Sequence, residues 1–443
     1  MPMNARDRFT RFLASAGALL IAALWAAAPA HAQLRIEITS GVTDPIPIAI
    51  VPFARAVPAD GGVDVAAIIQ NDLEGSGRFR AQPRAQMISM PTRIQDVSLA
   101  DWRASGNDYI VVGRVSALDG GQLAVDFELL NLLNGQQLAV GRFTGPQSAL
   151  RNAAHRVSDV IYEKILGVRG AFAARIAYVA VDGKPPEQRY QLIVADSDGE
   201  NARTILESRL PIMSPAWSPD GEWLAYVSFE NRKSAVYVQR VRTGERRQVS
   251  ARAGINGAPS WSPDGRRLAL ALGGSGGNVD VYVLDLASQN LTRITDDPAI
   301  DTEPVWAPDG KTLFFTSDRA GAPQIYRVAA QPGQQPKRIT FGSHYSARPR
   351  VSPDGTLLAF VTIDQGNYRI AVQDLSNGTV RVLSRGTLDE SPSFAPNGAM
   401  IIYSGRDRGQ SVLATVSVDG LTGQRLKADR GEVREPVWGP FQQ

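Results

Sequence analysis

The chain of 443 residues contains no cysteine, so neither a disulfide framework nor a thiol nucleophile is available to it. It also lacks a strong excess of charge, because 47 basic and 44 acidic residues give a formal net charge of +3. The segment before Gln33 holds three arginines and one aspartate, so its removal leaves +1. A nearly neutral chain lacks the basic footprint of a nucleic-acid-binding protein, and we expect no nucleic-acid partner.

Histidine is scarce as well. Beyond residue 32 the chain holds only His155 and His344, far apart, so we expect no metal site and no cofactor. His155 falls beside the apolar stripe of a predicted helix, which favours a solvated or half-buried structural role. The stretch Asp196–Glu200, with Glu207 at the twelfth place, approaches a calcium-loop pattern. Asn201 stands where that loop needs glycine, so we interpret the stretch as a plain turn.

Catalytic motifs are almost absent. Gly273–Gly277 matches the pattern G-x-S-x-G, but a nucleophile elbow needs a strand-to-helix turn and later Asp and His partners. This motif lies between two predicted strands of one repeat, where glycine and serine are ordinary hairpin residues, and only His344 follows it. We therefore predict that the protein is not an enzyme.

The first 32 residues have the features of a secretory signal peptide. Arg6, Arg8 and Arg11 precede an apolar run from Phe12 to Ala28, and Ala30–Ala32 supplies a small-x-small cleavage site. A retained membrane anchor is the alternative, but the run is short for a spanning helix. No second apolar stretch of that length follows, so we expect an exported, soluble product without direct membrane insertion.

A repeat dominates the rest of the chain. Its pattern is Pro-x-aromatic-x-Pro-Asp-Gly, with Val351 in place of the aromatic residue in the fourth copy and Asn397 in place of aspartate in the fifth. The first prolines of successive copies are 44, 45, 45, 43 and 44 residues apart. The copies are Pro215–Gly221, Pro259–Gly265, Pro304–Gly310, Pro349–Gly355, Pro392–Gly398 and the shortened Pro436–Pro440. Four short strands at a period of about 40–45 residues are typical of a β-propeller blade.

The number of blades follows from an offset between the ends of the repeat array. Arg175–Ala180 has the sequence of a second strand with no first strand before it, and Pro436–Trp438 is a first strand with no successors. The last strand should therefore complete the first blade and close the ring, which removes exposed sheet edges. We predict an all-β six-bladed propeller over residues 175–443.

Residues 33–168 lack the repeat and predict a smaller α/β domain. Leu34–Ile38 alternates in polarity like a strand, and Ile46–Val51, Tyr109–Val115, Leu123–Leu130 and Leu138–Phe143 are further strand candidates. Val65, Ile69 and Leu73 recur at helical spacing. A longer amphipathic helix runs from Leu150 to Ile165 and should end at Gly167. Val168–Ala174 is the expected linker.

Polar residues precede each Pro-x-aromatic strand, and the first strands of a propeller line its central channel. These residues should cluster at one channel mouth, where they form a plausible recognition surface or are simply solvated. Carboxylates among them offer a possible calcium site. The set is Asn256–Ala258, Asp301–Glu303, Ser346–Arg348, Leu388–Glu390 and Val433–Glu435.

The order of parts resembles the TolB family of the Tol–Pal system. The most specific segments are Ile46–Phe53, Asn256–Pro259, Thr302–Trp306 and Leu388–Pro392. The resemblance implies a monomeric, non-enzymatic periplasmic protein that supports outer-membrane integrity and constriction at division. It implies binding of the lipoprotein Pal at the channel mouth, a face that colicins also exploit, and binding of TolA through the mature amino terminus.

The resemblance places the partner-binding residues in two groups. The expected Pal-binding residues are Asn256, Ala258, Thr302, Glu303, Ala347, Arg348, Asp389, Glu390 and Glu435. The expected TolA-binding residues lie in Gln33–Asp44, namely Gln33, Leu34, Arg35, Ile36, Glu37 and Ile38. Some family members carry a histidine where this chain has Ile255, so that contact to Pal is not carried over.

Two other readings remain. Similar repeats occur in propellers that cap prolyl-oligopeptidase-type hydrolases, but those need an α/β-hydrolase domain that this chain lacks. A lectin-like propeller would favour near-identical pockets in every blade, whereas the mouth residues here vary. For Leu34–Ile38, the alternative to a partner-binding segment is an ordinary edge strand of the α/β domain.

Overall fold

The computed structural model describes residues 34–40, 42, 44–55, 63–274, 277–428 and 431–442. The predicted signal peptide at 1–32, the expected TolA-binding residue Gln33 and Ser275 of the glycine-rich motif lie outside the described residues. Within the described ranges, no helix is long and apolar enough to cross a membrane.

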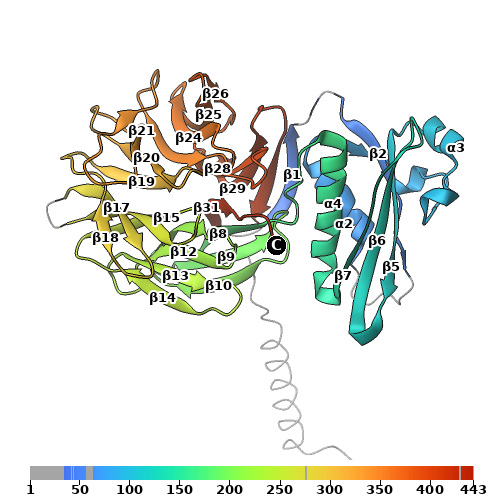
Figure 1. Ribbon diagram of the computed structural model, residues 1–443, viewed down its shortest axis with the longest axis horizontal. Helices are drawn as coiled ribbons and strands as arrows, with labels where there is room; N and C mark the ends of the chain where they lie inside the picture. Colours follow the sequence, from blue (N-terminus) through green and yellow to red (C-terminus); the bar gives the residue numbers. More distant parts are fainter. Residues whose placement is uncertain are drawn as a thin grey trace, which may run out of the picture. The chain divides into compact units, whose positions relative to one another are not determined.

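The α/β domain is built on a mixed sheet with the order β4-β2-β5-β6-β7 (Figure 1). Its strands are β2 (Ile46–Ile50), β3 (Ala54–Arg55), β4 (Phe79–Ala81), β5 (Tyr109–Ala117), β6 (Gln122–Asn131) and β7 (Gln137–Pro146), and β3 pairs only with β5. These bounds confirm the four strand candidates of this domain. The strands β2, β4 and β5 are parallel, whereas β5, β6 and β7 form antiparallel pairs.

Helices cover both faces of this sheet. On one face α2 (Val65–Gly75) and α4 (Leu150–Leu166) pack their buried Ile69, Leu73, Val157 and Ile161 against the strands. On the other face α3 (Leu99–Ala104) and the short 3₁₀ helices η1 (Arg84–Gln86) and η2 (Ile94–Asp96) surround Trp102, which has no exposed surface.

The ends of the two long helices have local causes. Asp64 caps α2, because its carboxylate accepts a hydrogen bond from the Ala67 amide at 3.0 Å. Gly167 ends α4 as predicted, in the left-handed conformation with φ of 78°, which glycine adopts without strain. Two further 3₁₀ turns, η3 (Asp119–Gly121) and η4 (Gln147–Ala149), connect β5 to β6 and β7 to α4.

The repeats fold into six antiparallel blades, to each of which the repeat array contributes four strands, and this confirms the predicted propeller. Blades 2 to 4 comprise β11 (Ile212–Trp217), β12 (Trp223–Ser228), β13 (Ala235–Arg240), β14 (Arg246–Ser250), β15 (Ile255–Trp261), β16 (Arg267–Gly273), β17 (Val279–Asp285), β18 (Leu291–Arg293), β19 (Asp301–Trp306), β20 (Thr312–Ser317), β21 (Gln324–Ala329) and β22 (Lys337–Arg338). Blades 5 and 6 comprise β23 (Ser346–Val351), β24 (Leu357–Asp364), β25 (Asn367–Asp374), β26 (Val380–Val382), β27 (Glu390–Phe394), β28 (Met400–Asp407), β29 (Gln410–Ser417) and β30 (Gly423–Ala428).

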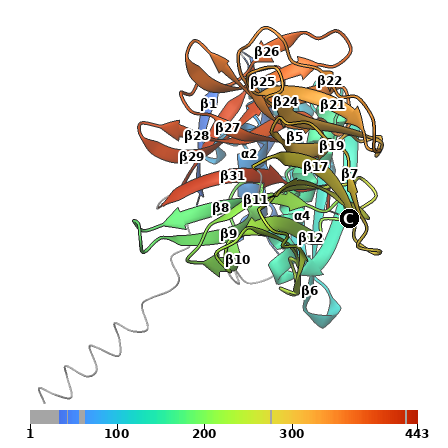
Figure 2. The same ribbon diagram turned by 90° about the vertical axis from the view of Figure 1, so that its left-hand side faces the viewer.

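Blade 1 is shared between the two ends of the repeat array, as the offset predicts. Its strands are β31 (Glu432–Trp438), β8 (Arg175–Asp182), β9 (Arg189–Asp196) and β10 (Arg203–Ser208). β31 pairs antiparallel with β8, with Val433 opposite Ala180 and Trp438 opposite Ile176 (Figure 2). The ring is therefore closed by main-chain hydrogen bonds between distant segments, which leaves no open sheet edge at this junction.

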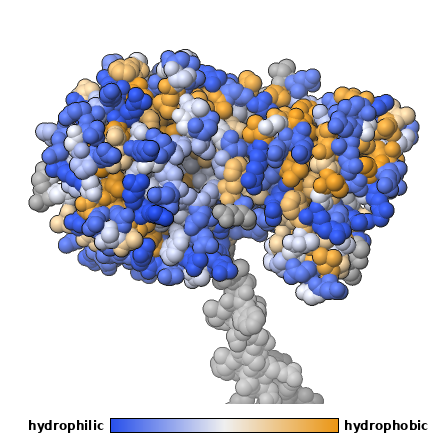
Figure 3. Space-filling view, in the orientation of Figure 1, coloured by the Kyte–Doolittle hydropathy of each residue, from blue (hydrophilic) through white to orange (hydrophobic). Residues whose placement is uncertain are grey.

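The Pro-Asp-Gly turns are stabilised by a recurring side-chain pattern. In blade 2 the Ser218 hydroxyl donates to Asp220 at 2.5 Å and accepts from the Trp223 amide at 2.9 Å, while Gly221 has φ of 69°. Blades 3 and 5 repeat these contacts with Ser262 and Ser352. The surface of the propeller that is visible in Figure 3 is mostly polar, as expected for a fold whose apolar residues lie between the blades.

The first described strand has an unexpected partner. β1 (Leu34–Ser40) is a strand, as its alternation predicts, but it does not join the sheet of the α/β domain. It pairs antiparallel with β30, with Leu34 opposite Ala428 and Ser40 opposite Gly423, and so forms a fifth strand of blade 6. The alternative of an ordinary edge strand of the α/β domain is therefore wrong for this conformation.

Candidate functional site

The channel mouth is built from the starts of the six first strands, and all six share one irregularity. The residue before each first proline has positive φ, between 46° and 57°, although none is glycine. At the same place every first strand loses register with its neighbour, which marks a β-bulge. We call these residues the mouth ring: Ser214, Ala258, Glu303, Arg348, Ser391 and Glu435.

This conformation is unfavourable for each residue by itself. A left-handed non-glycine residue costs about 1–2 kcal/mol, and a residue before proline is normally extended. The strain is repeated in all six blades, so the surrounding structure must impose it. Strained backbone that recurs at one surface is a reason to examine that surface for function.

Side chains of the mouth ring connect neighbouring blades. Glu303 accepts hydrogen bonds from the Thr316 hydroxyl and from the Arg348 amide, both at 2.9 Å. The Arg348 guanidinium lies 3.3 Å from Glu303 and donates to the Ser391 hydroxyl at 2.5 Å. Glu435 accepts from the Ser214 amide in the same manner. The ring therefore forms a polar network across the blades at the mouth.

Charge at the mouth is mixed and partly screened from water. Burial alone would lower the pKa of Arg348, but the negative charges of Glu303, Glu435 and Glu390 outweigh it and raise that pKa. The Arg348 side chain keeps 33 % of its surface exposed and that of Glu303 keeps 26 %. Both groups can therefore reach a partner while their orientation is held by the network.

The structure separates the expected Pal-binding residues into two groups. Ala258, Thr302, Glu303, Arg348, Glu390 and Glu435 are half-buried and remain accessible at the mouth. Three others are buried, since Asn256 has 0 % of its surface exposed and Ala347 and Asp389 have 3 % each. These three side chains are therefore not exposed for direct contact in this conformation, and their place in a partner-binding surface stays a prediction.

The buried residues shape the loops instead. The Asn256 amide oxygen accepts from the Ser250 hydroxyl at 2.7 Å and from the Arg252 amide at 2.9 Å, and its nitrogen donates to the Arg252 carbonyl at 2.7 Å. Asp389 accepts from the Gly386 amide at 2.9 Å. Both side chains hold the segment that leads into the next first strand. Nothing in the sequence distinguishes this structural role from direct contact with a partner.

The carboxylates at the mouth are already engaged, which weighs against the calcium alternative. Asp301 is fully buried and pairs with Arg319 at 2.8 Å, and Glu303 pairs with Arg348. In the part of the chain that the structure describes, the mouth carboxylates do not come together as a metal-ligand cluster.

Exposed apolar side chains also lie at the mouth end of several blades. Ile255, Ile300, Phe341 and Ile363 are exposed by 50, 47, 67 and 37 %. Ile255 and Ile300 directly precede buried residues of β15 and β19, Phe341 lies in the connection to β23, and Ile363 follows Thr362, which pairs with Ser346 at the mouth end of β23. Large apolar side chains that stay exposed beside oriented charged groups make this end of the propeller a candidate protein-recognition surface.

A second polar cluster joins the α/β domain to blade 1, and it overturns the expectation for His155. This side chain is only 1 % exposed, and its Nδ1 lies 2.8 Å from Asp72. Its Nε2 lies 3.8 Å from Asp198, in the turn after β9, and 3.9 Å from Asp196, the last residue of that strand. Burial lowers the pKa of His155, but Asp72 and the two other aspartates outweigh this and raise it to about 9.

This cluster is a charged contact rather than an evident metal centre. Asp72, His155 and Asp198 bring three possible ligand atoms together. However, Arg151 donates to Asp198 at 2.5 Å and to Asp196 at 3.3 Å, through the same carboxylate oxygens that face His155. The guanidinium therefore occupies the place from which those oxygens would bind a cation.

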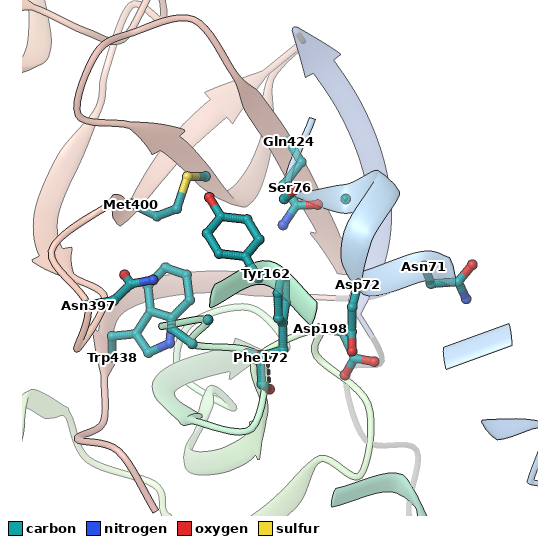
Figure 4. Close-up of a pocket in the computed structure, with 14 residues that line it drawn as sticks. Asn71, Asp72, Ser76, Tyr162, Phe172, Asp198, Asn397, Met400, Gln424 and Trp438 are labelled. Carbon is teal, nitrogen blue, oxygen red and sulfur yellow. Dashed lines mark hydrogen bonds between the residues drawn. The ribbon is translucent and has the colours of Figure 1, made fainter. Parts of the chain in front are cut away.

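A cavity of about 50 Å³ adjoins this cluster. Figure 4 shows Trp438 and Met400 on one side of it and Asp72 on the other, with Tyr162 and Phe172 between them. The volume has room for about one or two water molecules and not for a metabolite. We therefore regard it as part of the contact between α2, α4 and the propeller.

Comparison with known proteins agrees with this architecture. A family model described as the TolB amino-terminal domain matches residues 34–138, and one described as the TolB beta propeller domain matches residues 162–442. A "Tol-Pal system protein TolB" from Alcanivorax borkumensis is 49 % identical over 423 residues, covering 95 % of this chain and 96 % of the relative. The protein of the same name from Thioalkalivibrio sulfidiphilus is 51 % identical over 414 residues, covering 93 % and 95 %.

A solved structure supports the same assignment. The crystal structure of TolB from Acinetobacter baumannii is 40 % identical in sequence, with a TM-score of 0.85. The match covers 92 % of this chain and all of that one. With both family models, full-length relatives and a solved structure in agreement, the chain belongs to the TolB family of Tol–Pal system proteins.

Proposed function

We propose that this protein is a non-enzymatic periplasmic component of the Tol–Pal system that binds Pal at the channel mouth and TolA through its mature amino terminus. Acting as a monomer, it would support outer-membrane integrity and constriction during division. Membership of the family supports a role within the system. The observation that carries the Pal site is the mouth ring, in which half-buried charged groups are held in place, with exposed apolar side chains at the same end of the blades.

The mouth has the composition that protein partners use. Glu303 and Arg348 are held by each other and by neighbouring blades, so little side-chain entropy is lost when a partner binds them. Phe341 and Ile300 offer large apolar surfaces that a partner would remove from water. Ile255 would add an apolar contact at the position where some relatives carry histidine.

Calorimetric titration with Pal tests this site. Reversal of Glu303 and Arg348 together, as Glu303→Arg with Arg348→Glu, keeps their ion pair within the ring while it inverts the charges offered to a partner. We expect at least a tenfold loss of affinity, because charge-assisted contacts are each worth about 1.5–3 kcal/mol. Exchange of Glu222 and Arg240, a pair on the opposite side of the propeller, is the matched control and should leave affinity unchanged.

If the double reversal bound Pal as tightly as the parent, the mouth would not be the Pal site. A Phe341→Ala variant gives an independent measure, because it removes apolar contact without changing any charge. Colicins that use the same face should compete with Pal in this titration.

For TolA, we propose that residues Gln33–Asp44 exchange between two partners. The strand β1 of this segment pairs with β30, and among the described residues the sheet order gives it no second neighbouring strand. An extended segment near a chain end can instead add to a partner's sheet through the same main-chain groups. Pal binding would shift the balance between the docked and the released segment.

Deletion of residues 33–44 should abolish TolA binding and spare Pal binding. Retained TolA affinity in the deletion variant would disprove the amino-terminal site. Hydrogen exchange of the β30 amides, with and without Pal, then tests the exchange itself, because release of β1 leaves those amides unprotected.

A further inference from the structure

The repeat is broken at one place on the side of the propeller that carries the Pro-Asp-Gly turns. In blade 3, Arg267 lies over the ring of Trp306 at 4.6 Å, donates to the Gly310 carbonyl at 3.2 Å, and has Asp264 of its own turn at 3.9 Å. The arginine of this arrangement thus has both an aromatic surface and a nearby carboxylate.

Blade 1 repeats the arrangement without the carboxylate. Arg175 lies over the ring of Trp217 at 4.9 Å and donates to the Gly221 carbonyl at 2.7 Å. Where other blades continue from the second proline to Asp-Gly or Asn-Gly, blade 1 continues from Pro440 to Phe441 and Gln442. Within the described residues, Arg175 forms no ion pair with a carboxylate.

A cavity of about 580 Å³ opens at this position, between the closing strand β31 and blade 2. Its charged lining is four arginines and two acids: Arg175, Arg203, Arg240, Arg242, Asp220 and Glu222. Both acids are engaged, because Glu222 pairs with Arg240 at 2.6 Å, and Asp220 accepts from the Ser218 hydroxyl and the Glu222 amide within its own turn. The net charge facing the cavity is positive.

The two nearest arginines repel each other. Burial lowers the pKa of Arg175, and the charge of Arg203 lowers it further, with Asp196 acting in the opposite direction. Arg203 is fixed beside it, since its guanidinium donates to the Val241 carbonyl at 2.7 Å. Two like charges held at one cavity store repulsion that a bound anion would relieve.

We propose that this cavity binds a phosphate group, held by Arg175, Arg203 and Arg242. Guanidinium groups match phosphate oxygens in pairs, and a doubly charged phosphate neutralises two arginines where one carboxylate neutralises one. A pocket of this volume accepts a phosphate together with part of the molecule that carries it. The site is distinct from the channel mouth, so it does not depend on the proposed binding of Pal.

Titration of the full chain with sodium pyrophosphate, at constant ionic strength set by sodium chloride, tests the proposal. We expect saturable binding that weakens at least tenfold in Arg203→Gln, with partial recovery in Arg203→Lys, which keeps the charge. Arg203 is exposed, so its replacement should leave the fold intact, and the melting temperature without ligand checks this. Arg247→Gln, which removes an exposed arginine from the neighbouring blade-2 strand β14, is the matched control and should bind like the parent.

Equal binding by the parent and Arg203→Gln would overturn the proposal, as would no saturable binding by the parent. Sedimentation with phosphatidic acid vesicles, against phosphatidylcholine vesicles, separates the two sources of phosphate. Arg203-dependent sedimentation would support a lipid headgroup, and pyrophosphate binding alone would support a soluble phosphate compound. Tighter Arg203-dependent binding of a glutamate-rich peptide than of pyrophosphate would overturn the assignment to phosphate.

Discussion

The buried His155 should make the stability of this protein depend on pH in a defined window. Its pKa is raised from 6.5 to about 9 in the folded protein, chiefly because Asp72, Asp198 and Asp196 outweigh the effect of burial. A raised pKa means that the folded state holds the proton more tightly than the unfolded chain. The resulting stabilisation is fully present below pH 6.5 and is lost as the pH rises through about 9.

The magnitude follows from the shift. At 1.36 kcal/mol for each pKa unit, the change corresponds to about 3 kcal/mol of unfolding free energy. The other charged groups at this contact are Arg151 and Asp159. Burial raises the pKa of Asp159 to about 7. The change in unfolding free energy that accompanies its ionisation is therefore complete shortly above that pH, at the lower end of the pH window in which His155 loses its proton.

Urea unfolding between pH 6 and 10 tests the prediction by comparing the parent with His155→Gln. The parent should lose about 3 kcal/mol relative to the variant across this range, whereas Asp159 contributes equally to both proteins. His344 is exposed, so His344→Gln is the matched control and should follow the parent. Parallel curves for the parent and His155→Gln would refute the reasoning, as would an NMR titration showing an imidazole pKa near 6.5 for His155.

Three further predictions concern the propeller. Ala258→Gly should leave the unfolding free energy unchanged or raise it by up to about 1 kcal/mol, because glycine relieves positive φ. Ala216→Gly, at a position of β11 that pairs with Ala225 and does not have positive φ, should lower it. Equal losses would argue against strain at the mouth ring. Asn256→Ala should destabilise the protein by about 1–3 kcal/mol, because it leaves buried polar groups unpaired. It should also weaken Pal binding, although the side chain is buried, because it loosens the loop before Ala258; calorimetry measures both effects. Val433→Asp places an unpaired charge at a fully buried position of the closing strand β31, so it should cost at least about 3 kcal/mol and expose this strand to proteolysis. Glu432→Ala, at an exposed position of the same strand, should do neither.

Much of the architecture was predictable because it depends on short sequence segments that recur along the chain. Each Pro-Asp-Gly turn combines a preset φ with a glycine at φ near 70°, so the turns and the strands beside them follow from short segments. The offset between Arg175–Ala180 and Pro436–Trp438 then predicts ring closure, which the pairing of β31 with β8 confirms. The end of α4 at Gly167 likewise depends on one residue and its conformational freedom.

The functional surfaces were less predictable, because burial depends on distant neighbours. The sequence places Asn256 and Asp389 beside Ala258 and Glu390 at the mouth, but only the packed loops bury the first two and expose the others. Positive φ before proline runs against local preference, so the bulges that form the mouth ring follow from contacts between blades and not from any single repeat.

The sequence by itself therefore determined the blade number, the closing strand, the α/β domain and the position of the mouth, since each rests on local turn chemistry or on a repeated pattern. Tertiary structure decided which strand β1 pairs with, because main-chain hydrogen bonding carries no signature of its partner. It also decided the state of His155, whose charge depends on Asp72 and Asp198, residues that lie far from it in the chain and meet it only when the α/β domain packs against blade 1.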